Sequence, residues 1–223
     1  MKIHVHHLKV DLHLHTHYSE DGKTTLEEAI QYAKERQLDG IAITDHDTVQ
    51  GALKLAKRKD LIVIPGIEVS SRHGHVLGLN ITEPIRPKLD ITETVEKIRL
   101  LGGVAVVAHP AVAIKTGMGT TIRSASGIDA VEVINASAFP FSLSTYLSRR
   151  LAHRLGLPET AGSDSHYPQE IGSAYTIIDA DSNRDDIMEA IRKGKTEPAG
   201  KPISWTRRLE RGSQNVRKRL GGH

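Results

Sequence analysis

Four residues that can bind a metal ion alternate along one short stretch near the start of the sequence. Residues 10–22 read VDLHLHTHYSEDG, in which every second position from 11 to 17 carries such a group, namely Asp11, His13, His15 and His17. In an extended strand, alternate side chains point to the same face, so these groups would share a face opposite the valine and leucines between them. A row of imidazoles with a carboxylate makes a poor apolar core and is typical of metal coordination.

Further imidazoles and carboxylates recur near the ends of other predicted strands, where functional residues collect in parallel α/β folds. They are Glu20, Asp21, Asp45, His46, Asp47, Glu68, His73, His75, His109, Asp164 and His166. Only the strand at 129–134, which ends at Asn135, is expected to contribute no titratable group. Each residue alone has an ordinary explanation, such as a helix cap or an edge charge, whereas one metal cluster explains all of them together. Histidine and carboxylate ligands without thiolate suit Zn, Mn or Fe.

The elements that would position these residues follow from the hydrophobic pattern. Apolar runs predict strands near 9–13, 40–44, 61–69, 75–80, 104–108, 129–134 and 159–163. Amphipathic patterns predict helices over 25–36, 48–58, 91–101, 143–155 and 184–193, the first with Thr24 or Thr25 as its cap. Apolar strands that alternate with helices favour a parallel sheet with the helices outside. Seven strands favour a barrel, with an open doubly wound sheet as the alternative.

The composition is that of one domain that would hold a metal through nitrogen and oxygen ligands. The chain has 223 residues, 38% of them hydrophobic, which suffices for one substantial core. It has no cysteine, so disulfides, thiolate ligands and cysteine nucleophiles are excluded. No apolar run approaches the ~20 residues of a membrane span, and the first residues lack the apolar region of a secretory signal. We therefore expect a cytoplasmic protein with no membrane partner.

Positive charge is concentrated in residues 201–223. This segment holds seven basic residues and one acidic residue, whereas the whole chain has a net charge of only +3. We therefore divide the chain into a mildly acidic domain at 1–200 and a basic tail at 201–223. The tail is either an arm that binds nucleic acid or a terminal helix or extension with Trp205 and Leu209 packed on the domain. We prefer the second interpretation.

Five motifs, in the order of the chain, resemble those of the polymerase and histidinol phosphatase (PHP) domain superfamily of metal-dependent phosphoesterases. The matching segments, within residues 10–166, read DLHLHTHYSEDG, AITDHDT, PGIEVS followed by HVLGL, VAHP and AGSDSH. The resemblance implies an α/β fold, a distorted seven-stranded (β/α) barrel similar to a TIM barrel. It also implies a cluster of two or three divalent metal ions, for which Zn, Mn and Fe are the candidates.

The resemblance further implies which residues bind each ion. His13, His15 and Asp164 would bind the first ion, His75 and His109 the second, with Glu68 bridging the two, and His46 and His166 the third with a carboxylate of the first motif. Many members read Ser-Asp-Gly where this chain reads Ser-Glu-Asp-Gly, so Glu20 and Asp21 are both candidates. We prefer Asp21 because it precedes the glycine. The expected ligands are His13, His15, Asp21, His46, Glu68, His75, His109, Asp164 and His166.

The implied reaction is hydrolysis of a phosphate ester by metal-activated water, which requires no side-chain nucleophile. We expect Asp45 to orient an imidazole ligand and Asp47 to cap the helix that follows it. The segment 111–128, with Lys115 and Arg123, is the expected substrate-binding loop. It is short, which favours a small phosphomonoester or a nucleotide as substrate.

Two other functions remain open at this stage. The chain could be a nuclease or exonuclease that holds single-stranded nucleic acid through its basic tail. It could also be a non-catalytic subunit of a nucleic-acid assembly, although the complete set of expected ligands argues against that. The sequence predicts no oligomeric state.

Overall fold

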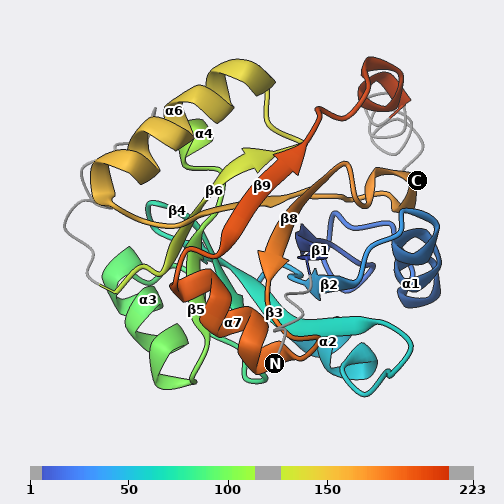
Figure 1. The fold of residues 1–223 in the computed structure, drawn as a ribbon, viewed down its shortest axis with the longest axis horizontal. Helices are drawn as coiled ribbons and strands as arrows, with labels where there is room; N and C mark the ends of the chain where they lie inside the picture. The colour runs from blue at the N-terminus through green and yellow to red at the C-terminus, as the bar shows by residue number, and fades with distance from the viewer. Residues whose placement is uncertain (1–6, 114–126, 211–223) are drawn as a thin grey trace, which may run out of the picture.

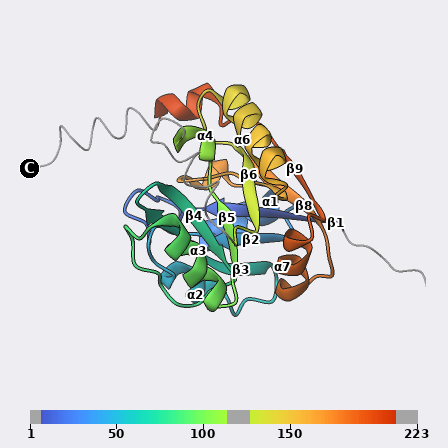
Figure 2. The same ribbon diagram turned by 90° about the vertical axis from the view of Figure 1, so that its left-hand side faces the viewer.

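The computed structural model describes residues 7–113 and 127–210, which form a curved sheet with helices around it (Figures 1 and 2). In chain order the elements are β1 (His7–Leu14), α1 (Leu26–Glu35), β2 (Gly40–Ile43), α2 (Gln50–Leu55), β3 (Ile62–Ser71), β4 (Gly74–Leu79), α3 (Ile91–Leu100), β5 (Val104–Val107), α4 (Pro110–Ala113), β6 (Ala130–Asn135), α6 (Phe141–Leu155), β7 (Glu159–Gly162), the 3₁₀ helix η2 (Pro168–Glu170), β8 (Ala174–Asp179), α7 (Arg184–Arg192) and β9 (Thr196–Gly200). None of the described helices is long and apolar enough to cross a membrane.

The first seven strands are neighbours in the sheet in the same order as in the chain. The seam between β7 and β1 is closed at one end by backbone hydrogen bonds. Asp164 N–H donates to the carbonyl of His13 at 2.7 Å, and His15 N–H donates to that of Ser165 at 2.9 Å. Strand β8 pairs with the first half of β1, and β9 pairs with β8, which extends the sheet to nine strands. The predicted barrel is therefore confirmed, but the predicted count of seven strands is too low.

The two strands that the hydrophobic pattern did not predict lie at the edge of the sheet. In β8, buried and partly buried side chains alternate, as expected for a strand with one covered face. In β9, Pro198 and Gly200 are residue types that are depleted in strands. Proline is tolerated there because β9 is an edge strand, whose outer N–H groups need no partner.

The prediction of a parallel sheet is wrong for β4, β8 and β9. Strand β4 runs antiparallel to both of its neighbours, β3 and β5. Only two residues separate Ser71, the end of β3, from Gly74, the start of β4. A connection this short closes a hairpin and cannot form the crossover that parallel strands need. As a consequence β4 starts at the end of the barrel where the parallel strands finish.

Apolar side chains fill the barrel, and α7 closes one end of it. Ile187 and Ile191 of α7 pack in one cluster with residues of six barrel strands. Arg192 donates hydrogen bonds to the carbonyls of Gly102 and Gly103, which directly precede β5. This end is therefore the amino end of the parallel strands, and their carboxyl ends lie opposite α7.

The remaining long helices cover the outside of the sheet. Apolar clusters join α1 and α2 to β1, β2 and β3, α3 to β3, β4 and β5, and α6 to β6 and β7. Helix α1 begins after Thr25, whose hydroxyl accepts a bond from Glu28 N–H while the Glu28 carboxylate accepts one from Thr25 N–H. Thr25 rather than Thr24 is thus the cap, in a reciprocal capping box.

The described part of the basic tail is attached to the domain through Ile203. Ile203 is buried in the cluster around β6 and β7, and its N–H donates to the carbonyl of Ala136. Residues 205–210 are helical. Trp205 and Leu209 are 66% and 70% exposed, so neither is buried against the domain as expected, although the Trp205 ring contacts Phe139 of the loop after β6. The expected substrate-binding residues Lys115 and Arg123 lie outside the described residues.

Candidate metal centre

Nine histidine and carboxylate side chains meet at the end of the barrel opposite α7. They are His13 in β1, His15 just after it, Asp21 before α1, His46 after β2, Glu68 in β3, His75 at the start of β4, His109 after β5, and Asp164 and His166 after β7. These are all of the expected ligands. Each belongs to a set of three or four residues whose potential ligand atoms lie within 4.8 Å of one another.

Glu68 lies in the middle of this cluster. Its side chain is only 1% exposed, and its two oxygens face different imidazoles. Oε1 lies 2.8 Å from His75 Nδ1 and 3.1 Å from His109 Nε2. Near Oε2 are His13 Nε2, His15 Nε2 and His46 Nδ1, at 3.1, 3.1 and 3.3 Å. A carboxylate placed in this way can bridge two cations.

Asp164 adds a second carboxylate beside the imidazoles of β1. Its Oδ1 lies 3.6 Å from His13 Nε2 and 3.3 Å from His15 Nε2. Its backbone has a φ of +51°, in the left-handed region that aspartate tolerates better than most residues. Ser137 donates a hydrogen bond to the Asp164 carbonyl, and Asn135 donates one to its Oδ2. These contacts hold the carboxylate toward the cluster.

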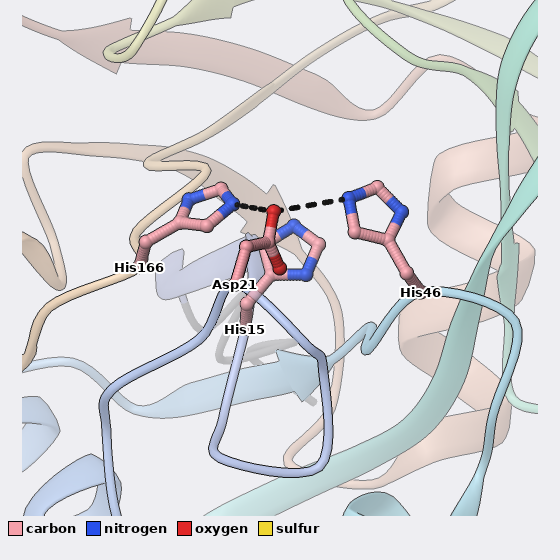
Figure 3. A group of neighbouring side chains, drawn as sticks. All are labelled: His15, Asp21, His46 and His166. Carbon is pink, nitrogen blue, oxygen red and sulfur yellow. Dashed lines mark hydrogen bonds and ion pairs between the residues drawn. The ribbon is translucent and has the colours of Figure 1, made fainter. Parts of the chain in front are cut away.

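A third group of ligands lies at the rim (Figure 3). Asp21 lies between two imidazoles, with Oδ2 2.9 Å from His166 Nε2 and 3.7 Å from His46 Nε2. His15 completes the group. Glu20 is exposed and is not in any of these sets. The geometry therefore favours Asp21 over Glu20 as the carboxylate of the first motif.

We predict that Asp21→Asn lowers metal-dependent hydrolysis more than Glu20→Gln does. Both substitutions remove one negative charge from the same loop, so the general electrostatic effect is matched. Only the first removes an oxygen that faces His46 and His166. Steady-state kinetics on both variants, at saturating metal, measures the difference. A larger loss in Glu20→Gln would show that the alignment is off by one residue.

Glu132 also belongs to the cluster, in a set with His13 and His109, but was not predicted from the sequence because it lies inside β6 and not at its end. Its Oε1 lies 2.9 Å from His13 Nδ1, and its Oε2 accepts hydrogen bonds from His109 N–H and the Asn135 amide. Glu132 and His13 are both almost fully buried. Glu132 thus fixes the His13 ring so that the opposite nitrogen, Nε2, faces Glu68. Because side chains alternate between the two faces of a strand, the position of Glu132 in β6 could have indicated that it points into the barrel.

We predict that Glu132→Gln weakens metal binding without unfolding the protein. Carboxylates behind a histidine ligand typically change metal affinity about 10- to 100-fold when they are lost. Glutamine keeps the size of the side chain and can still bond the His109 N–H. Titration of the metal-free protein in a metal buffer gives the affinity. An affinity equal to that of the unmodified protein would contradict the role assigned to Glu132.

The two aspartates around His46 have structural roles that differ from those expected. Asp45 does not bond an imidazole, because its oxygens accept hydrogen bonds from Thr16 N–H and Thr16 Oγ–H, at 2.6 and 2.8 Å. Asp47 does not cap α2, whose cap residue is Val49. Its Oδ1 instead accepts a bond from Ser70 N–H at 2.8 Å. Both residues therefore hold backbone segments around the centre.

Ser19 takes the orienting role that was expected of Asp45. Its hydroxyl lies 3.1 Å from His15 Nδ1 and accepts a hydrogen bond from His46 N–H at 2.7 Å. Asp11 does not join the cluster, because its carboxylate accepts bonds from Ser163 N–H and Gly172 N–H at the β1–β7 seam. Of the four alternating residues, only His13 and His15 thus reach the centre.

The members of the cluster shift one another's pKa values. Burial raises the pKa of Glu68, but the charge of His13 and hydrogen bonds from the imidazoles outweigh it and hold the pKa well below its usual value. Burial lowers the pKa of His15, but hydrogen bonds to Asp164 and Glu68 outweigh it and raise the pKa to about 9. The carboxylate is therefore ionised, whereas His15 must release a proton before its nitrogen can bind a cation.

Two buried nitrogens of the cluster have contacts that hydrogen bonding does not explain. Nδ1 of His46 and Nδ1 of His75 form no hydrogen bond with any described residue. Each nevertheless lies close to an oxygen of Glu68, at 3.3 and 2.8 Å. Donor atoms that converge in this way can bind a shared cation. Imidazole and carboxylate donors without thiolate fit Zn, Mn or Fe.

Comparison with protein families agrees with this site. The model of the PHP domain matches residues 11–137, and a model described as PHP-associated matches residues 144–196. The uncharacterized protein MJ1587 of Methanocaldococcus jannaschii is 37% identical over 142 residues, which cover 58% of this chain and 82% of that protein.

Two relatives have named activities, and the match covers a smaller share of each of them than of MJ1587. The 5'-3' exoribonuclease Rnm of Salmonella typhimurium is 30% identical, over 83% of this chain and 55% of that protein. The 3',5'-nucleoside bisphosphate phosphatase of Chromobacterium violaceum is 38% identical, over 36% of this chain and 30% of that protein. The chain therefore spans about a third to a half of these two proteins.

One solved structure extends the comparison to the fold. A two-domain protein of Bacteroides vulgatus, described as containing a predicted PHP-like metal-dependent phosphoesterase, matches with a TM-score of 0.74. The match covers 88% of this chain and 66% of that chain at 18% identity, so it shows a shared fold.

Proposed function

This chain belongs to the PHP domain family, and we propose that it is a metal-dependent phosphoester hydrolase that acts on a small phosphomonoester or a nucleotide. The observation that carries the proposal is the arrangement around Glu68, whose two oxygens face five imidazoles. A bridging carboxylate of this kind holds two cations close enough to act on one phosphoryl group.

We further propose that the cluster holds two or three divalent ions, of Zn, Mn or Fe. Two of the expected ligand sets correspond to groups in the structure, His13, His15, Glu68 and Asp164 for the first ion and Asp21, His46 and His166, with His15 alongside, for the third. For the second ion we keep Glu68, His75 and His109, because both imidazoles face Glu68 Oε1. Every ligand is a nitrogen or an oxygen, in keeping with the preference of these metals. His13 and His15 are fully buried, so solvent competes little for the inner positions.

The residues of the chain contribute orientation and the exclusion of water. When bound, divalent ions lower the pKa of a coordinated water and neutralise charge on the phosphoryl oxygens. Glu132 and Ser19 contact the outer nitrogens of His13 and His15, so that the inner nitrogens face Glu68. The proposal requires no nucleophilic side chain, since the attacking group is water.

A nuclease is the second candidate, and the position of Arg208 favours it. Arg208 donates to the carbonyls of Ala136, Ser137 and Ala138, on the loop that contacts Asp164. The start of the basic tail therefore lies next to the centre, where it would attract a polyanion. The similarity to an exoribonuclease over most of this chain supports the same candidate.

The experiment that tests the proposal measures metal content and substrate range on the same preparation. We expect about two or three divalent ions per chain by elemental analysis, loss of activity after chelation, and recovery with Mn, Zn or Fe. Phosphomonoesters and nucleotides are to be compared with single-stranded oligonucleotides. Faster cleavage of oligonucleotides would favour the nuclease, and a chain that binds no metal would overturn both candidates.

A further inference from the structure

Two large aromatic side chains are exposed and contact each other on one surface of the protein. The rings of Phe139 and Trp205 pack edge to face, with centroids 5.4 Å apart. They are 61% and 66% exposed. The chain has only two phenylalanines and one tryptophan, so two of these three residues lie in this one exposed pair. Exposed apolar surface of this kind often marks a binding site.

This aromatic pair is close to the candidate metal centre. Phe139 lies on the loop that follows β6, two residues after Ser137, whose hydroxyl bonds the carbonyl of Asp164. Two residues of extended chain span at most about 7 Å. Phe139 is therefore attached directly to a segment that holds one of the candidate ligands.

The pair is also held in place by contacts other than the one between its two rings. Arg208 donates three hydrogen bonds, of 3.0 to 3.1 Å, to the carbonyls of Ala136, Ser137 and Ala138. Its guanidinium lies 5.8 Å from the centroid of the Phe139 ring. The buried Ile203 fixes the segment just before Trp205. The helix at 205–210 and the loop at 136–139 are thus joined independently of Trp205.

The surroundings of the pair favour a nucleobase over an apolar partner. The described segment that carries Trp205, residues 201–210, has three basic residues and one acidic residue, and its net positive charge attracts a phosphate group. Exposed aromatic rings bind bases by stacking, which requires little sequence specificity because every base has a flat π face. The pair lies beside a centre that acts on phosphate esters. A nucleoside carries both groups in one molecule.

We propose that Phe139 and Trp205 form a stacking platform for the base of a nucleoside phosphoester whose phosphate occupies the metal centre. This inference rests on the proposed function and narrows its substrate to esters that carry a base, as free nucleotides or at the end of a single strand. Stacking would place the base beside the loop of β6 while the ester faces Glu68 and Asp164.

The single tryptophan allows a direct test that does not depend on catalysis. Trp205 is the only tryptophan of the chain, so emission that is excited selectively in the tryptophan band, where the five tyrosines do not absorb, reports on the platform. We expect adenosine monophosphate and a short oligothymidylate to quench this emission in a saturable manner, whereas ribose 5-phosphate, which lacks a base, does not. The titration uses the full chain, with and without added metal. Absence of quenching by both base-containing probes would overturn the proposal.

Kinetics on variants supplies the second readout. In Trp205→Ala and Phe139→Ala, the ratio of kcat/KM for a nucleotide to that for phenyl phosphate should fall roughly 5- to 150-fold, the range measured for one stacked base. Leu209→Ala is the matched control, because Leu209 is 70% exposed on the same helix. An equal fall in that variant would contradict stacking.

Two further outcomes separate this proposal from others. Base-dependent quenching in a protein that hydrolyses neither ester would support the platform and refute the proposed function. Tryptophan emission that depends on protein concentration but not on nucleotide would indicate that a second copy of the chain covers the pair, which would overturn the proposal.

Discussion

Replacement of Glu68 by glutamine is expected to lower the rate of metal-dependent hydrolysis by at least roughly 10³-fold. This is the upper end of the rate loss that follows removal of one electrostatic group from an active site. Glu68 is the only expected ligand that contacts five of the imidazoles. Glutamine keeps the shape of the side chain but removes the negative charge and one acceptor oxygen. We therefore also expect Glu68→Gln to retain fewer ions per chain than the unmodified protein.

Elemental analysis after gel filtration and steady-state kinetics measure these two effects. Asp129→Asn is a suitable control. Asp129 directly precedes β6, its side chain is only 7% exposed, and its carboxylate pairs with Arg99 away from the cluster. That variant should lose some stability while it retains its metal. Full metal content and near-normal turnover in Glu68→Gln would refute the bridging role.

Asp164→Asn is expected to lower turnover by about 10²- to 10³-fold. Asp164 supplies the second carboxylate next to His13 and His15. Asparagine, like aspartate, tolerates the left-handed backbone at this position, so the variant should fold. The loss would then reflect the missing charge and not a strained backbone.

Asp47→Asn is the matched control for this variant. Asp47 also follows a barrel strand and has a φ of +55°, close to the +51° of Asp164. Its carboxylate bonds the backbone of Ser70 and lies outside the sets of potential ligands. Thermal unfolding compares the two variants for stability, and kinetics compares them for activity. Equal turnover in both would contradict a ligand role for Asp164.

One property of the fold allowed several residues of the centre to be predicted from the sequence. Strands can be recognised from short apolar runs, and the polar residues that follow parallel strands meet at one end of the barrel. His46, His109 and His166 could be assigned in this way. All nine expected ligands meet in the structure, although His13 and Glu68 lie inside their strands and His75 lies on an antiparallel strand.

The roles that could not be predicted depend on direction and on contacts between distant segments. His75 belongs to the cluster only because β4 runs antiparallel, which the short connection after Ser71 should have indicated. Glu132 was overlooked because a strand residue that faces the interior is normally apolar. The partners of Asp45 and Asp47 lie on neighbouring loops and strands, so no local pattern could identify them.

The pairing of β1 with elements from the far end of the chain has a consequence for folding. β1 bonds β8 along its first half and the segment after β7 at its end. Ser163, for example, bonds the His13 carbonyl across 150 residues of sequence. Contacts of such long range form slowly, because a large loop must close first. Since His13 and Asp164 come together only when this closure occurs, a newly synthesised chain acquires its complete metal affinity in the same step that completes its barrel.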